Sequence, residues 1–388
     1  MTNETATQRP RDVADEKIRQ WFDSGTYSSG DRLPSQRDLA EQLGVSRTTI
    51  RTVLKNLEEE GLVRSGPSGS RRVTKKAING ADVLADTVAV LTSAATGPPK
   101  RSGQTTGWEE HIYAGIMARL RERNRHGLTL ASSRVLEQDV SYLLSHSFRG
   151  VVAFRSFADT EHGVKVLREI AQTGLPLAVF GDLGQVKGVD TVISDQKRGG
   201  YELTRWLIER GCRRILPFGF GYDPYGEDAT PWVRQRLAGY RDAMEEATLE
   251  PCEPVGSFDV FHVDGGPIES FDPKMRLCVG FLLEHLQGDD PVDAVMTASD
   301  GLVPPVTAAV QRLGKEPQRD VMVVGYDNYW SDVPETKIEP TPPAATVDKR
   351  NPEIGAALVD LVEERAAGKL APEPQRRVVQ PELVVFSR

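Results

Sequence analysis

The stretch that most constrains the fold covers residues 31–73, which read DRLPSQRDLAEQLGVSRTTIRTVLKNLEEEGLVRSGPSGSRRV. Ser35 can cap a helix, and Asp38 follows three residues later in the spacing of a capping box. Apolar residues then recur at helical spacing until Gly44, a residue type that often ends helices. The pattern predicts a short, well-capped helix that is followed by a tight turn.

A second helix is predicted from Ser46, as its cap, to Gly61, where it closes. At about 100° per residue, this helix has one apolar side and one basic side. The apolar side consists of Ile50, Val53, Leu54 and Leu57. The basic, hydroxyl-rich side consists of Arg47, Thr48, Arg51, Thr52 and Lys55. Two helices of this kind, joined by a tight turn, predict a helix-turn-helix that binds DNA.

Elements on both sides of this pair complete the expected domain. Before it, Val13, Ile18, Trp21 and Phe22 indicate a first helix that packs beneath the other two and ends at Gly25. After it, residues 62–64 and 71–73 predict the two strands of a β-wing, with a turn over 66–69. We therefore expect a winged helix-turn-helix domain over residues 1–74.

The charge of the chain is unevenly distributed. The net charge is −8 over 388 residues, an unexpected sign for a protein that binds DNA. Residues 1–76, however, hold 14 Lys and Arg against 11 Asp and Glu, whereas the remainder holds 34 against 45. Phosphate binding depends on the local field, so a basic domain suffices, and the acidic part is predicted to stay away from DNA.

The composition also argues against several other classes of protein. The apolar runs are too short to span a bilayer, and no secretory signal follows the polar N-terminus. The histidines are scattered, and the cysteines lack the paired spacing of a disulfide framework or a zinc site: Cys212, Cys252 and Cys278. We expect a cytoplasmic protein without a metal, a cofactor or a membrane partner.

The rest of the chain shows a different rhythm. Residues 75–86 are small and polar, as in a linker. From residue 87 onward, short apolar runs such as Val151–Phe154 alternate with amphipathic stretches such as Val135–Ser147. This alternation predicts an α/β fold with parallel sheets covered by helices on both faces. Residues 87–388 are long for one such sheet, so we expect two lobes with a cleft between them.

The first region resembles the winged helix of GntR-family transcriptional regulators. The resemblance rests on DRLPSQRDLAEQLGVSRTTIR and on the LPS, GVSR and EEGLV elements. It implies DNA contacts from the start of the second helix and from the PSxR segment. The wing reads GPSGSRR here instead of a Gly-rich GxGT turn, which puts its glycine at Gly69. The implied DNA-contacting residues are Arg37, Arg47, Thr48, Thr49, Arg51 and Gly69. Arg71 in the basic wing is a further candidate, with general electrostatic attraction to DNA as the alternative.

The remainder resembles the effector-binding domain of LacI/GalR proteins, a relative of the periplasmic sugar-binding fold. The supporting segments include GYELTRWLIERGCRRI, RQRLAGYRDAM, DAVMTASDGL, DVMVVGYDN and AATVDKRNPEIG. The combination resembles the arabinose-repressor branch of GntR proteins. The implied ligand contacts are Asp182, Arg236, Ser299 and Asp327. Ser299 stands where Asn is common, and Pro304-Pro305 replace small residues, so the identity of the ligand does not transfer.

The residues themselves support part of this ligand site. Asp327 follows a predicted strand at 321–325, on the edge where open α/β sheets bind ligands, although an Asp there could equally cap the next turn. Aromatic residues near strand ends could stack on the C–H faces of a sugar. Trp108 and Phe220 are the candidates of this kind that we place in the cleft, while noting that single aromatics usually belong to the core.

These patterns predict a ligand-responsive transcriptional regulator that is not an enzyme. We expect a repressor of carbohydrate genes that binds a palindromic double-stranded operator as a homodimer and responds to a small sugar-like effector. An alternative is a regulator whose α/β region only dimerises or binds a metabolite that is not a sugar. A further alternative, an α/β enzyme fused to a DNA-binding module, would need a catalytic lysine in a suitable context, and none is apparent.

Overall fold

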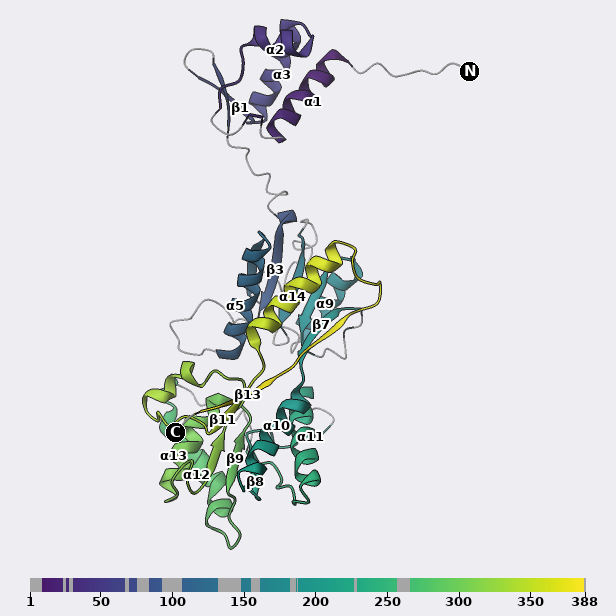
Figure 1. Cartoon of the computed structure of the whole chain (residues 1–388). Coiled ribbons are helices and arrows are strands. Elements are labelled where there is room, and N and C mark those ends of the chain that lie inside the picture. Colours follow the sequence, from purple (N-terminus) through teal and green to yellow (C-terminus); the bar gives the residue numbers. More distant parts are fainter. Residues whose placement is uncertain are drawn as a thin grey trace. The chain divides into compact units, whose positions relative to one another are not determined.

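The fold is given by a computed structural model (Figure 1). The chain divides into two compact units, Met1–Val83 and Leu84–Arg388. This division falls within the stretch predicted as a linker, residues 75–86, of which 84–86 are described. The described residues are 9–23, 26–27, 31–66, 70–74, 84–92, 107–131, 148–154, 161–181, 186, 188–226, 229–256 and 266–386.

The first unit has three helices and a two-stranded wing within its described residues. The Ser35 side chain accepts from the backbone of Asp38 in a capping box, and Gly44 ends the helix with φ of +64°. The Ser46 side chain accepts from the backbone of Thr49 at the start of the next helix. The predicted caps are thus confirmed. The elements are α1 (Pro10–Asp23), α2 (Gln36–Leu43), α3 (Arg47–Glu59), β1 (Val63–Ser65) and β2 (Arg71–Val73).

The apolar sides of these helices form one core. Ile18 of α1, Leu39 of α2 and Ile50 of α3 are fully buried in a single cluster. The wing strands pair in antiparallel register, with Val63 opposite Val73, and both of these valines also reach the core. Because the apolar face of α3 is fixed inward, its basic face is directed toward solvent.

The second unit begins with a lobe built on a six-stranded parallel sheet, ordered β12-β7-β6-β5-β3-β4. Alternate residues of its strands pack against α9 on one face and against α5 and α14 on the other. The predicted covering of both faces is confirmed. The elements are β3 (Thr87–Thr92), α5 (Gly107–Glu122), β4 (His126–Ala131), β5 (Gly150–Phe154), α9 (Glu161–Gln172), β6 (Leu177–Phe180), β7 (Asp190–Ser194), α14 (Asn351–Ala366) and β12 (Arg376–Val379).

The other lobe has a parallel sheet ordered β10-β9-β8 and an antiparallel pair of β11 with β13. One hydrophobic cluster joins these strands to the surrounding helices. Three short 3-10 turns cover Asp300–Leu302, Trp330–Asp332 and Pro334–Lys337. The other elements are α10 (Gln196–Glu209), β8 (Ile215–Phe218), α11 (Pro231–Glu246), α12 (Phe271–Gln287), β9 (Ala294–Thr297), α13 (Val303–Arg312), β10 (Met322–Val324), β11 (Ala345–Asp348) and β13 (Glu382–Val385).

The chain passes between the two lobes where β7 leads to α10, β11 to α14 and β12 to β13 (Figure 1). The sequence did not predict β12 and β13, which lie at the C-terminal end of the described chain. The helix expected over Val135–Ser147 lies outside the described residues. Because these crossings join the lobes near the ends of their strands, the carboxyl edges of both sheets contribute to one region.

Metal ligands and membrane-spanning helices were also sought in the described part of the chain. Cys212, Cys252 and Cys278 are free thiols. No group of His, Cys, Asp or Glu among the described residues is arranged to hold a metal ion. None of the helices that the structure describes has both the length and the apolar character needed to cross a bilayer.

Two glycine contacts bring α10 and α11 unusually close. A Cβ atom on Gly239 of α11 would collide with the carbonyl oxygen of Lys197 in α10. A Cβ atom on Gly200 of α10 would likewise collide with the carbonyl oxygen of Arg236. The close approach sets the distance between the first turn of α10 and the side chain of Arg236, which matters for the site below.

Gly239→Ala should therefore destabilise the protein by about 1–3 kcal/mol, because two helix backbones would have to separate. The matched control is Gly280→Ala in α12, where the added methyl group meets open space. That change should stabilise the protein by up to about 1 kcal/mol, because Ala favours a helix over Gly. Urea unfolding of both variants measures the difference, and equal stabilities would contradict the proposed close packing.

Candidate functional site

The first candidate site is the outer face of α3 together with the start of α2. Arg47, Thr48 and Arg51 are exposed on α3, and Arg37 is exposed on α2. Among the residues that the structure describes, Arg37, Arg47 and Arg51 have no hydrogen-bond or ion-pair partner. These guanidinium groups are thus available for a ligand, and planar guanidinium groups suit phosphates and guanine edges.

The other predicted DNA contacts are placed differently. The Thr49 hydroxyl lies 2.8 Å from that of Ser46 and belongs to the helix cap. Arg71 is mostly buried, and its Nη2 lies 3.7 Å from Oε2 of Glu58. Arg72, beside it in the wing, is exposed. Gly69 lies outside the described residues. The structure thus brings Arg37, Arg47, Thr48 and Arg51 to the surface and leaves Arg71 in a structural ion pair.

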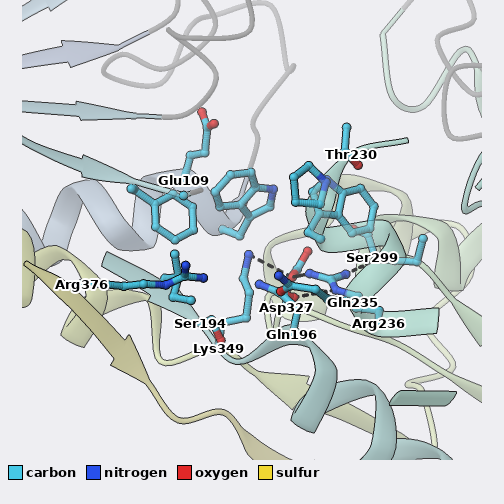
Figure 2. A pocket seen from close by; sticks show the side chains of 17 residues that line it. Glu109, Ser194, Gln196, Thr230, Gln235, Arg236, Ser299, Asp327, Lys349 and Arg376 are labelled. Atoms are coloured by element: carbon cyan, nitrogen blue, oxygen red, sulfur yellow. Dashed lines mark hydrogen bonds and ion pairs between the residues drawn. The ribbon is translucent and has the colours of Figure 1, made fainter. Parts of the chain in front are cut away.

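The second candidate site is a pocket of about 260 Å³ in the second unit. Its lining lies at the carboxyl ends of strands in both lobes and includes Phe180, the last residue of β6. Ser299 after β9 and Lys349 after β11 also line it (Figure 2). The aromatic walls are Trp108, Phe180 and Trp232. Such an edge is where α/β folds bind ligands, and a pocket with aromatic walls and few polar groups suits a small molecule.

A buried ion cluster forms the base of this pocket. Asp327 Oδ1 lies 2.9 Å from Arg236 Nη2 and 3.0 Å from Lys349 Nζ, and all three side chains are about 95% buried. Arg236 also donates from Nε to Gln196 Oε1 at 2.8 Å and from Nη1 to the Ala298 carbonyl at 2.7 Å. One carboxylate therefore serves two cations, while Gln196 of α10 and the backbone directly after β9 hold the arginine in place.

Aromatic rings enclose the two cations. The Arg236 guanidinium carbon lies 3.4 Å from the ring centre of Tyr326 and 4.6 Å from that of Trp232. Lys349 Nζ lies 4.1 Å from the ring centre of Trp108. Ring faces attract cations and shield them from water. Burial lowers the pKa of Lys349, although the negative charge of Asp327 opposes that effect.

The backbone at Asp327 is strained. Its φ is +94°, in a region that residues with a side chain rarely adopt. Its backbone nitrogen donates to the Val347 carbonyl at 2.9 Å, and Asn351 Nδ2 donates to its carbonyl at 3.4 Å. The carboxylate contacts Arg236 and Lys349, so Asp327 does not act as the turn cap that was the alternative. Strain of this kind is often found at functional sites.

A second buried carboxylate shapes the adjacent loop. Asp300 accepts hydrogen bonds from the backbone nitrogens of Tyr329 at 2.8 Å and Trp330 at 3.2 Å, and from the Thr346 hydroxyl at 2.7 Å. Burial raises the pKa of Asp300 to about 7. The Tyr329 hydroxyl in turn lies 2.6 Å from the Ser299 hydroxyl in the pocket wall. Ser299 is therefore held in place by its neighbours.

The structure thus brings four of the predicted ligand residues into one pocket: Trp108, Arg236, Ser299 and Asp327. Phe220 is not one of its lining residues. It is buried in the core, with its ring centre 6.4 Å from that of Trp232, and supports the pocket wall from behind. Asp182 lies outside the described residues.

Sequence reasoning missed Lys349, Gln196 and Glu109, which also line the pocket. Lys349 comes directly after β11 in AATVDKRNPEIG, so the strand-end argument applied to Asp327 could have found it. Gln196 begins α10 directly after β7 and its cap, in the same kind of position. Glu109 lies in the first turn of α5, where no comparable rule points to a ligand.

Comparisons with known proteins found a family match in each of the two units. Residues 10–73 match the family of bacterial regulatory proteins called gntR, and residues 204–385 match the periplasmic binding protein-like domain. The transcriptional regulator CelR of Thermobifida fusca is 27% identical over 377 residues, which cover 91% of this chain and 98% of that protein. The arabinose metabolism transcriptional repressor of Geobacillus stearothermophilus is 22% identical over 384 residues, which cover 95% and 94%.

Solved structures support the same fold. A CelR–cellobiose complex is similar with a TM-score of 0.58 and 24% identity, covering 91% of this chain and 99% of that one. A lac repressor dimer bound to operator has a TM-score of 0.54 and 18% identity, covering 77% and 92%. The chain joins a helix-turn-helix domain of the gntR family to a periplasmic binding protein-like domain, and it is a transcriptional regulator.

Proposed function

We propose that the chain is a repressor that binds a pseudo-palindromic operator as a homodimer and is controlled by a small, hydroxylated effector in the pocket of its second unit. The observation that carries the effector site is the Arg236–Asp327–Lys349 cluster beneath aromatic walls. Charged donors and acceptors orient hydroxyl groups, while flat rings bind the C–H faces of a sugar. The relative solved with cellobiose supports a carbohydrate-like ligand.

The DNA-reading step follows from the free arginines. α3 presents Arg47 and Arg51 for the major groove, and Arg37 at the start of α2 is placed for phosphates. A single DNA-contacting helix such as α3 covers only a short half-site, so two copies of the chain are needed for specific binding. A protein that binds operator DNA works where the DNA is, so we propose a cytoplasmic protein whose role is binding without catalysis.

The connections between the lobes supply the means of control. The chain crosses between the two sheets at residues 194–196, 348–351 and 379–382, and two of these crossings carry pocket residues, Gln196 and Lys349. A ligand that contacts both lobes stabilises the arrangement in which both sets of contacts are made. The ligand regulates DNA binding only to the extent that its affinity for this arrangement of the lobes differs from its affinity for the alternative arrangement.

The test of this function uses the full chain and a pool of random duplex DNA. Repeated selection and footprinting should give two inverted half-sites, about one helical turn or a multiple of it apart. Gel shifts with the selected operator, with and without each member of a sugar panel, should then identify compounds that change its affinity. Selection of a single, unrepeated half-site would contradict the dimer. If no hydroxylated compound changes the affinity for the operator, the proposed class of effector is wrong.

A further inference from the structure

Lys349 is a buried cation whose hydrogen-bonding capacity is only partly used. An ammonium group has three N–H donors. Within the described part of the chain, its hydrogen-bonding and ionic partner is Asp327 alone, through Oδ1 at 3.0 Å, while the Trp108 ring covers another side. Burying an ammonium without partners for its donors is unfavourable. The remaining donors of Lys349 are available to a molecule in the pocket that it lines.

Among the described residues, the buried base of the pocket holds two cationic side chains, Arg236 and Lys349, and one carboxylate, Asp327. A third cation, Arg376, and the carboxylate of Glu109 also line the pocket, and both of these side chains have further partners of their own. Asp327 uses the same oxygen for both buried cations, so it neutralises neither of them fully. In Figure 2 the carboxylate of Glu109 points away from this cluster, and its negative charge has a smaller effect on Lys349 than that of Asp327. In surroundings of low polarity, a surplus cation attracts an anion far more strongly than it would in water.

The third cation lies across Lys349 from the aspartate. In Figure 2 the Arg376 guanidinium and the Asp327 carboxylate are on opposite sides of the Lys349 ammonium. An anion beside Arg376 is therefore separated from the repelling carboxylate. Arg376 belongs to β12 of the six-stranded sheet, whereas Lys349 follows β11 of the other lobe. A group held by both would contact both lobes at once, as a ligand that sets their arrangement must do.

We propose that the effector carries an anionic group, a carboxylate or a phosphate on a small hydroxylated molecule, which Lys349 and Arg376 bind together. The Arg236–Asp327 pair and the aromatic walls bind the rest of the molecule. The pocket volume of about 260 Å³ calls for a compact ligand. This inference rests on the proposed function, because it takes the pocket as the effector site.

The test measures binding of two simple anions to the full chain by calorimetry and thermal unfolding. Inorganic phosphate and acetate represent the two sources of the anionic group, and sodium chloride at equal ionic strength is the reference. At least one of the two anions should stabilise the wild-type protein beyond the effect of chloride, and which of them does so identifies the source. Lys349→Met should weaken that binding at least about tenfold, because the variant loses a charge-assisted hydrogen bond to the anion.

Two further variants make the result decisive. Lys349→Met leaves Asp327 paired with Arg236, and Arg376→Gln changes an exposed side chain, so both should fold. Arg376→Gln should also weaken anion binding, whereas Lys165→Met, at a lysine whose side chain is 74% exposed on α9, should not. No anion effect beyond chloride, or equal binding by all the variants, would overturn the inference. Operator binding and a response to neutral sugars in the same preparation would then leave the proposed function standing.

Discussion

Asp327→Ala is expected to lower the free energy of unfolding of the second unit by about 3–5 kcal/mol, the usual cost of breaking a buried ion pair. The carboxylate is the partner of two buried cations, Arg236 and Lys349, at 2.9 and 3.0 Å. Its removal leaves both of these charges without their carboxylate partner in a largely buried site walled by aromatic rings. Few single substitutions in this chain should cost as much.

The matched control is an exposed ion pair. Asp242 Oδ2 lies 2.6 Å from Lys197 Nζ, but the side chain of Asp242 is 48% exposed. Asp242→Ala should therefore change stability by no more than about 1 kcal/mol. Urea unfolding compares the two variants. A double variant that combines Asp327→Ala with Lys349→Met should recover part of the loss, because one of the stranded charges is gone. An Asp327→Ala protein as stable as the wild type would refute the shared carboxylate.

This expectation affects how effector binding is measured. A loss of effector response in Asp327→Ala would not distinguish a damaged fold from a lost ligand contact. Asp327→Asn keeps the shape of the side chain and one acceptor oxygen for the two cations. It should lose less stability than the alanine variant while weakening the hydrogen bonds that the charged group makes with a ligand. Effector titration is best done with this variant.

The elements that local sequence specifies were predicted well. The caps at Ser35 and Ser46 and the turn at Gly44 depend on contacts within a few residues, so the reader helix could be placed from the sequence. The strands β12 and β13 could not be predicted in this way. Arg376–Val379 pairs with residues 191–194, far away in the sequence, and its RRVV sequence shows no alternation of polar and apolar residues that would predict a strand. Its strand conformation comes from the tertiary partner.

The same distinction applies to the ligand site. Asp327 and Ser299 could be predicted from the sequence, because residues that follow parallel strands gather at one edge of the sheet. Trp108 and Phe220 looked equivalent in the sequence, yet Trp108 lines the pocket and Phe220 lies in the core. Which aromatic ring faces a cavity depends on how the surrounding helices pack, and the sequence of a single loop does not contain that information.

Arg47→Ala is expected to weaken specific operator binding severely while leaving the fold and the effector pocket intact. Arg47 is the first residue of α3, is exposed, and has no partner among the described residues, so its loss removes nothing from the core. A lost bidentate contact with a base costs about 1–3 kcal/mol. A dimer loses that contact in both half-sites, which roughly doubles the cost and weakens binding by about 30-fold to more than 10⁴-fold.

The measurement is a gel shift with the selected operator and with unrelated DNA, at several salt concentrations. If Arg47 reads a base, the variant should lose affinity for the operator far more than for unrelated DNA. If it only neutralised a phosphate, both affinities should fall together and the salt dependence should become shallower. The control is Lys17→Ala, at an exposed lysine on α1 and away from the DNA-contacting face of α3. This variant should bind the operator almost normally. Near-normal operator affinity of Arg47→Ala would mean that α3 does not enter the groove through its first turn, and the DNA-reading face would have to be placed elsewhere on the domain.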